Sequence, residues 1–170
     1  NKSSEGNLIA RANTPVMDRL KKMCPHTQLA AAGEAVGLSK GTVGNSEAGH
    51  IHIGSGRRIL SDKVRIDQAI ADASFFQNEV FLDVIRDAKE TGNALHLMGI
   101  VSFFSSHGSV DHLLALMDIA KQERITAVFI HAMLGRRGEK LESGAKYIEI
   151  VEKKCRALNL GKVVSVIGRY

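Results

Sequence analysis

One segment of the chain, residues 44–57, places a serine among the kinds of neighbours that a reactive side chain needs. Ser46 is followed at short spacing by an acid, two histidines and an arginine: Glu47, His50, His52 and Arg57. The glycines between them let the backbone turn sharply and approach a ligand closely. A serine becomes a nucleophile only if another group makes the loss of its proton less costly. The residue types therefore indicate either a nucleophile at Ser46 or an ordinary glycine-rich turn.

Three common serine and glycine motifs do not fit this segment. The α/β-hydrolase elbow needs a glycine two residues after the serine, where this chain has Ala48. The run 54–56 lacks the third glycine of a dinucleotide fingerprint, and no Lys-Ser or Lys-Thr pair completes a phosphate-binding P-loop. His50 and His52 have no carboxylate cluster nearby, so we interpret them as scaffolding of the loop rather than as metal ligands.

Alternating helices and strands follow the serine segment. Apolar residues at helical spacing predict a helix over 79–91, and a short apolar run predicts a buried strand over 94–101. The same alternation predicts a helix over 109–123, a strand over 126–132, a helix over 141–158 and a strand over 162–167. Upstream we expect a helix over 15–22, begun by Pro15, and loops or short elements over 30–37 and 39–50. Strands alternating with helices in this way predict an α/β fold of βαβ units with a parallel sheet.

Hydroxyl and basic side chains follow the three predicted strands. Ligands of an open parallel sheet bind beyond the carboxyl ends of its strands. The residues at these ends are Ser102, Ser105, Ser106 and His107, then His131, Arg136 and Arg137, and finally Arg169. Arginine binds phosphate or carboxylate through two parallel hydrogen bonds, and histidine can donate or carry a proton. We interpret this edge as an anion site, with plain solvated arginines as the alternative.

The composition narrows the class of partner. The 170 residues carry a net charge of +5 and are 44% hydrophobic, as in an ordinary globular protein. The charge is spread along the chain and aromatic residues make up only 5%, so we expect no nucleic-acid partner. No apolar run is long enough to span a membrane and no secretory signal opens the chain, so we expect a cytoplasmic protein with Cys24 and Cys155 reduced. The first residue is not methionine and the last follows a predicted strand closely, so we also expect a fragment.

The string GNSEAGH followed by IGSGR resembles the serine signature of the cofactor-independent (2,3-bisphosphoglycerate-independent) phosphoglycerate mutases. Further matches in the same order run along the whole chain, among them Arg65-Ile66-Asp67, Ser74-Phe75-Phe76, Asp111-His112-Leu113 and Gly168-Arg169-Tyr170. The resemblance implies a metal-dependent isomerase that interconverts 3-phosphoglycerate and 2-phosphoglycerate in glycolysis and gluconeogenesis. Ser46 would be phosphorylated during turnover and bound to a metal ion, and His107, Arg137 and Arg169 match the family's substrate-binding residues.

The resemblance also implies the cofactors and the division of the chain. Two divalent ions, Mn²⁺ or Mg²⁺, would serve in place of 2,3-bisphosphoglycerate, and the protein would be a monomer acting on a small phosphorylated acid. Residues 1–60 would be a segment of a metal-binding α/β domain of the alkaline phosphatase superfamily. Residues 61–170 would be the first part of the inserted phosphotransferase domain. The family's other metal ligands would lie outside the chain, so we expect the chain by itself to be inactive.

Two connections depart from the family pattern. After the first strand, Phe103 and Phe104 stand where the family has aspartate and glycine, and Ser109 stands for a histidine. After the second strand, Gly135 and Gly138 replace two aspartates. The loss of carboxylates makes the expected pocket more positive. Two alternatives therefore stay open: a paralogue that acts on another phosphorylated or phosphonate acid, and a non-catalytic anion-binding fragment.

Overall fold

The computed structural model describes residues 5–102, 108–135, 140 and 142–168, and its contacts separate two compact units, residues 1–31 and 32–170. The first unit contains two short helices, α1 (Leu8–Arg11) and α2 (Pro15–Met23), whose side chains are not buried. The prediction of a helix from Pro15 is confirmed. Proline suits this position because the first N–H groups of a helix have no partner within it.

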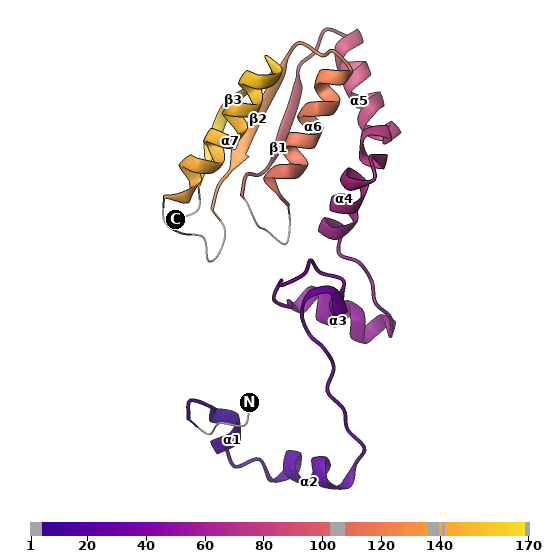
Figure 1. The fold of residues 1–170 in the computed structure, drawn as a ribbon, viewed down its shortest axis with the longest axis vertical. Coiled ribbons are helices and arrows are strands. Elements are labelled where there is room, and N and C mark those ends of the chain that lie inside the picture. Colours follow the sequence, from indigo (N-terminus) through magenta and orange to yellow (C-terminus); the bar gives the residue numbers. More distant parts are fainter. Residues whose placement is uncertain (1–4, 103–107, 136–139, 141, 169–170) are drawn as a thin grey trace. The chain divides into compact units, whose positions relative to one another are not determined.

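The second unit starts with short helices and continues as alternating helices and strands (Figure 1). Its elements are the 3-10 helix η1 (Gly33–Val36), α3 (Ser46–Ser55), α4 (Asp62–Ala71), the 3-10 helix η2 (Ser74–Gln77), α5 (Glu79–Glu90), β1 (Leu95–Ile100), α6 (Val110–Gln122), β2 (Val128–Met133), α7 (Ser143–Leu158) and β3 (Lys162–Ile167). All elements predicted from residue 79 onward are confirmed to within two residues at each end. None of the helices in the described ranges is both long and apolar enough to span a bilayer.

The three strands form one parallel sheet in the order β1-β2-β3, which confirms the predicted α/β architecture. Ile100 pairs with Met133, and Met133 pairs with Ile167. A register shift between Ile130 and His131 interrupts the ladder between β2 and β3. The carboxyl ends of the strands nevertheless lie side by side, so the three connections that leave them start from one edge of the sheet.

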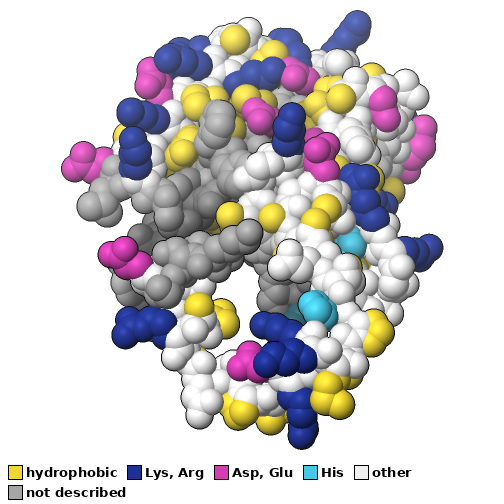
Figure 2. Space-filling view, turned by 60° about the horizontal axis from the view of Figure 1, so that its bottom comes forward, with side chains coloured by type: hydrophobic (Ala, Val, Ile, Leu, Met, Phe, Trp, Pro, Cys, Tyr) yellow, Lys and Arg dark blue, Asp and Glu magenta, His cyan; other side chains and the backbone are white. Residues whose placement is uncertain are grey.

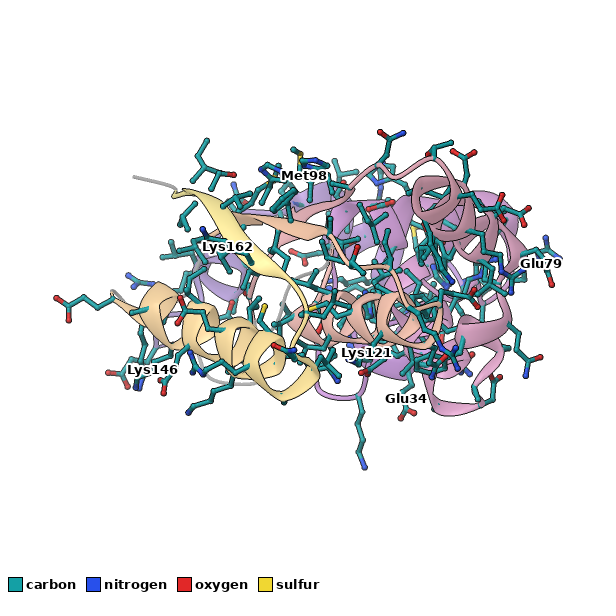
Figure 3. All side chains as sticks on the ribbon, turned by 90° about the horizontal axis from the view of Figure 1, so that it is seen from above. Glu34, Glu79, Met98, Lys121, Lys146 and Lys162 are labelled. Atoms are coloured by element: carbon teal, nitrogen blue, oxygen red, sulfur yellow. The ribbon has the colours of Figure 1, made fainter. Side chains whose placement is uncertain are left out.

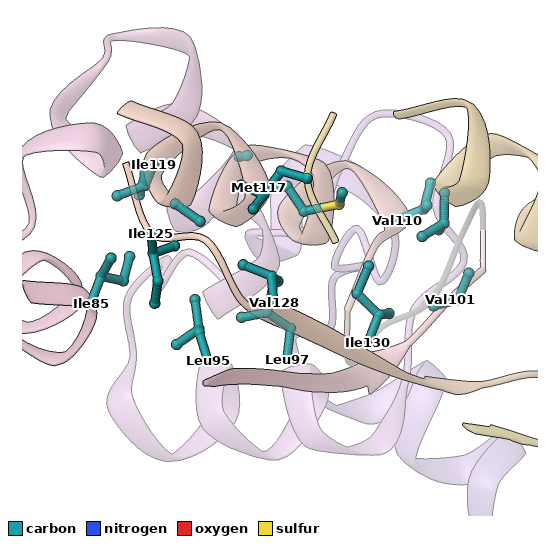
Figure 4. Packing of buried hydrophobic residues seen from close by; sticks show 14 of the residues in the cluster. Ile85, Leu95, Leu97, Val101, Val110, Met117, Ile119, Ile125, Val128 and Ile130 are labelled. Atoms are coloured by element: carbon teal, nitrogen blue, oxygen red, sulfur yellow. The ribbon is translucent and has the colours of Figure 1, made fainter. Parts of the chain in front are cut away.

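The main core lies between the sheet and the helices α6 and α7, which lie on one side of it (Figure 3). Met117 and Ile119 of α6 and Ile130 of the central strand are fully buried in this core (Figure 4). Burial of a side chain of this size stabilises the fold by about 1.5–3 kcal/mol. On the other side of the sheet the side chains of His96 and Met98 are exposed, and Met98 points away from the helices in Figure 3.

Candidate functional site

Ser46 is the first residue of α3 and is exposed. The preceding residue, Asn45, caps the helix, because its side-chain oxygen accepts a hydrogen bond from the Ala48 N–H at 2.8 Å. Gly56 ends the helix with a φ of 63°, a conformation that glycine adopts without strain. Of the loops or short elements expected over 39–50, residues 46–50 form the first half of the ten-residue helix α3, because favourable ends offset the low helix propensity of the glycines inside.

The Ser46 hydroxyl is not activated by the histidine one turn away. The Nδ1 atom of His50 lies 2.7 Å from the Ser46 carbonyl oxygen and 3.2 Å from the Ser46 Oγ. A carbonyl oxygen only accepts hydrogen bonds, so Nδ1 carries the proton and donates it. The same nitrogen cannot then accept the hydroxyl proton. His50 holds the first turn of α3 together, and a nucleophilic Ser46 needs another activating group.

His52 connects α3 to the segment that follows it. Its Nδ1–H donates to the Ala48 carbonyl at 2.6 Å, and its Nε2 accepts the Ile59 N–H at 3.0 Å. Both ring nitrogens are therefore occupied by backbone groups. This geometry agrees with the interpretation of the histidine as scaffolding, since neither nitrogen has a lone pair left for a metal ion.

A cavity of about 540 Å³ opens next to the start of α3. Asn45 and Glu47, the two neighbours of Ser46, line it from α3, whereas Ser46 itself does not. Gly108 and His112 line it from the other side, where the connection from β1 enters α6. The remaining wall comes from η1 and the residue Leu38 after it, from α3, and from α4 with the residues just before it. The structure thus brings the flanks of the serine and the start of α6 to one cavity.

A carboxylate, an imidazole and an ammonium group meet at the side of this cavity. The Nε2 of His112 lies 2.8 Å from Oδ1 of Asp67, and the Lys63 ammonium pairs with the other carboxylate oxygen. Partial burial acts to raise the pKa of Asp67, but the hydrogen bonds from Lys63 and His112 outweigh it and lower the pKa below its ordinary value. Asp67 is therefore an anion at neutral pH. This cluster cannot be predicted from residue spacing in the sequence, since 45 residues separate its carboxylate from its histidine.

The predicted substrate-binding residues His107, Arg137 and Arg169 lie outside the described residues, as do Ser105, Ser106 and Arg136. The residues next to them are described. Ser102 is fully buried where β1 ends, and its carbonyl oxygen accepts the Val110 N–H at 3.0 Å. The roles predicted for the three substrate-binding residues stay predictions.

His131, predicted at the carboxyl end of the second strand, lies two residues before the end of β2. His131 is inside β2, paired with Ser165 of β3. Its Nδ1 lies 2.7 Å from the Ser165 Oγ, and its Nε2 lies 2.9 Å from Nδ1 of His96 on β1. The strand extends one residue further than predicted at its end, to Met133, because Met133 still pairs with both neighbouring strands.

On the face shown in Figure 2, positively and negatively charged side chains are mixed. Figure 2 shows lysine and arginine side chains dispersed among acidic ones over the visible face. The expectation that the net positive charge is spread along the chain agrees with this view. The surface shown there does not present the continuous basic stripe that marks many nucleic-acid-binding proteins.

Comparison with known proteins decides the family. Residues 66–170 match the family model described as BPG-independent PGAM N-terminus. The chain is 47% identical over 166 residues to the 2,3-bisphosphoglycerate-independent phosphoglycerate mutase of Moorella thermoacetica, covering 98% of this chain and 32% of the relative. The chain belongs to the 2,3-bisphosphoglycerate-independent phosphoglycerate mutase family. The mutase of Clostridium beijerinckii is 43% identical over 167 residues, covering 98% of this chain and 33% of the relative.

A solved structure supports the same assignment. A Leishmania mexicana phosphoglycerate mutase, crystallised at low cobalt concentration, superposes with a TM-score of 0.77 at 26% identity. The similarity covers 93% of this chain and 30% of the Leishmania chain. This chain thus spans about a third of the length of the relatives it matches.

Metal-binding side chains are not clustered in the described part of the chain. The described residues contain no group of three or more histidine, cysteine, aspartate or glutamate side chains arranged to bind an ion. Catalytic zinc sites, for comparison, use about three protein ligands.

Proposed function

We propose that this chain is the part of a phosphoglycerate mutase that carries the phosphoryl-accepting serine. The whole protein would interconvert 3-phosphoglycerate and 2-phosphoglycerate through a phosphoserine at Ser46, in glycolysis and gluconeogenesis and without 2,3-bisphosphoglycerate. The main observation that supports this proposal is the position of Ser46 as the exposed first residue of α3.

A phosphoryl group on Ser46 would lie at the amino end of a helix. The first N–H groups of a helix have no carbonyl partners within it, and the helix dipole favours an anion there. Phosphate groups are bound at such positions in many proteins. Glu47 in the same turn acts in the opposite sense, because its carboxylate repels a dianion. A phosphoserine at this position therefore requires cations from elsewhere.

The proposed reaction has two half-reactions with matched bonds. The Ser46 Oγ attacks the phosphorus of 3-phosphoglycerate, the bond from phosphorus to the C3 oxygen breaks, and that oxygen takes up a proton. The C2 hydroxyl of the resulting glycerate then loses a proton and attacks the phosphoserine. The bond from phosphorus to Oγ breaks, which releases 2-phosphoglycerate and restores Ser46.

The substrate-binding part of the proposal rests on the sheet. His107, Arg137 and Arg169 belong to the connections that leave β1, β2 and β3, and the ends of these strands are aligned. Three cationic or hydrogen-bonding side chains starting from one edge suit the carboxylate and phosphate of a phosphoglycerate.

The family resemblance adds the cations and the setting. Two divalent ions, Mn²⁺ or Mg²⁺, supply the stabilisation of the alkoxide and the neutralisation of phosphate charge when bound, with Ser46 as one ligand. The division into a phosphatase-like segment to residue 60 and a phosphotransferase part from residue 61 belongs to the same proposal. The proposal also includes that the whole protein is a cytoplasmic monomer. The free thiols Cys24 and Cys155 are consistent with a reducing cytoplasm.

A chimera tests the proposed function. This chain replaces the 166 matching residues of the Moorella mutase, and conversion of 3-phosphoglycerate is measured with Mn²⁺. We expect activity that Ser46→Ala abolishes. The matched control is Ser55→Ala at the other end of α3, which should leave the activity unchanged. A folded chimera that converts neither phosphoglycerate would contradict the proposal.

The departures at Phe103, Phe104, Gly135 and Gly138 favour a second candidate, a paralogue that acts on another phosphorylated or phosphonate acid. A panel of such acids given to the same chimera separates the two candidates.

Calorimetric titration of this chain with 3-phosphoglycerate, with and without Mn²⁺, examines binding separately from turnover. Binding that Arg137→Ala removes and Arg156→Ala keeps would support the anion edge, since Arg156 is an exposed arginine on α7.

A further inference from the structure

Asp67 of α4 and His112 of α6 form a pair that the proposed function does not use. The Nε2 of His112 lies 2.8 Å from Oδ1 of Asp67, and the His112 side chain is only 13% exposed. Because Asp67 is an anion, it accepts the hydrogen bond, so Nε2 carries a proton. The second carboxylate oxygen pairs with Lys63, which fixes the carboxylate from the other side.

The second ring nitrogen of His112, Nδ1, has no hydrogen-bond partner within the described residues. Among the described residues, the only buried side-chain nitrogen or oxygen without a hydrogen-bond partner is the Thr42 hydroxyl. Nδ1 of His112 forms none of the hydrogen bonds found in these ranges, so it is reached by solvent. His112 lines the cavity beside Asn45 and Glu47, the two neighbours of Ser46, and it also lines a second cavity beside Leu113 and Leu116.

A carboxylate that holds one nitrogen of an imidazole while the other nitrogen stays open is an arrangement suited to proton transfer. The carboxylate fixes the tautomer and the ring orientation and stabilises the imidazolium once it forms. The sequence adds a reason for such a group here. Gly135 and Gly138 stand where the family pattern has carboxylates, so the connection after β2 offers no acidic side chain at these two positions.

We propose that His112 is a catalytic acid and base of the proposed mutase reaction, with Asp67 as its positioning residue. This rests on the proposed function. His112 enters as the imidazolium and gives its Nδ1 proton to the C3 oxygen as the bond from that oxygen to phosphorus breaks. The neutral ring then takes the proton of the C2 hydroxyl as this oxygen attacks the phosphoserine. Ser46 enters and leaves as the alkoxide, so protons balance over the cycle.

The test uses the chimera with the Moorella mutase. General acid and base catalysis contributes about 10²–10⁴-fold, so His112→Gln should lower kcat within that range with a smaller change in KM. Asp67→Asn should lower kcat less, and the double variant should be no slower than His112→Gln. Added imidazole should restore part of the activity of His112→Ala.

A matched control separates catalysis from packing. Arg86 pairs with Glu123 at the other end of α6, as Asp67 pairs with His112 at the start. Arg86→Gln should change thermal stability slightly and leave kcat unchanged. If His112→Gln lowers only stability, or if imidazole rescues nothing, the proposal is overturned while the mutase assignment stands. An inactive parent chimera would instead remove the proposed function and this proposal together.

Discussion

Replacing Gly37 with alanine tests how the wall of the cavity is built. Gly37 follows η1 with a φ of 65°, in the left-handed region. Its carbonyl oxygen accepts the Ser61 N–H at 2.8 Å, which joins this turn to the start of α4. A Cβ at this position would lie 1.8 Å from the Ile59 carbonyl oxygen. The contact is with backbone, so no side-chain rotation can relieve it.

Two costs add in this variant. A residue other than glycine in the left-handed region costs about 1–2 kcal/mol. Overpacking adds about 1–3 kcal/mol, because the 59–60 segment must move away and strain the bond from Ser61. Gly41 provides the matched control. It has a φ of 75° and nothing within 4 Å of its ideal Cβ, so Gly41→Ala should bear only the first cost.

Amide hydrogen exchange measures the difference in stability between the two variants directly at Ser61. We expect the Ser61 N–H to exchange about five- to 150-fold faster in Gly37→Ala than in Gly41→Ala, which corresponds to about 1–3 kcal/mol. The Ile130 N–H in the sheet should exchange at the same rate in both variants. Equal exchange of Ser61 in the two variants would refute the reasoning, because the steric contact would then have no energetic consequence.

Three further outcomes follow from the packing and the charges. Ile130→Ala should lower the free energy of unfolding by about 2–5 kcal/mol in urea titrations, and Val164→Ala, at a position 44% exposed, by less than about 1 kcal/mol. The lowered pKa of Asp67 gives stability that is present above about pH 4 and lost as the pH falls through the folded-state pKa; Asp67→Asn should flatten the unfolding free energy against pH in that window. His52→Phe should speed exchange of the Ile59 N–H by about fivefold, since a lost hydrogen bond costs about 1 kcal/mol; an unchanged rate would show that the bond does not form in solution.

The elements that the sequence predicts best are those whose stability comes from burying an apolar face. Ile119 and Ile130 belong to patterns with helical and strand periodicity, and the structure buries both. Helix α3 could not be predicted in this way, because its side chains form no apolar face and its glycines have low helix propensity. The cap at Asn45 is a local signal that could have located its start.

Predictions of the site are limited by contacts between distant residues. The pair of Asp67 and His112 exists only because α4 packs against α6, and no spacing rule describes that contact. The second strand was predicted to end at residue 132, one residue early, because strand ends are set by pairing with neighbouring strands, which cannot be seen in the sequence. Ser46 was located by its string of neighbours, whereas its place on a helix depended on the cap.

The central position of β2 shapes how the sheet can fold. Leu95 pairs with Val128 and Phe129 pairs with Lys162, so both ladders first join residues 33 positions apart. Closing loops of equal length costs equal entropy, so loop closure does not favour the β1–β2 connection over the β2–β3 connection. The choice then depends on burial, and the fully buried residues of α6 favour the half made of β1, α6 and β2. We expect the transition state for folding to contain this half, with β3 added afterwards as the chain completes its sheet.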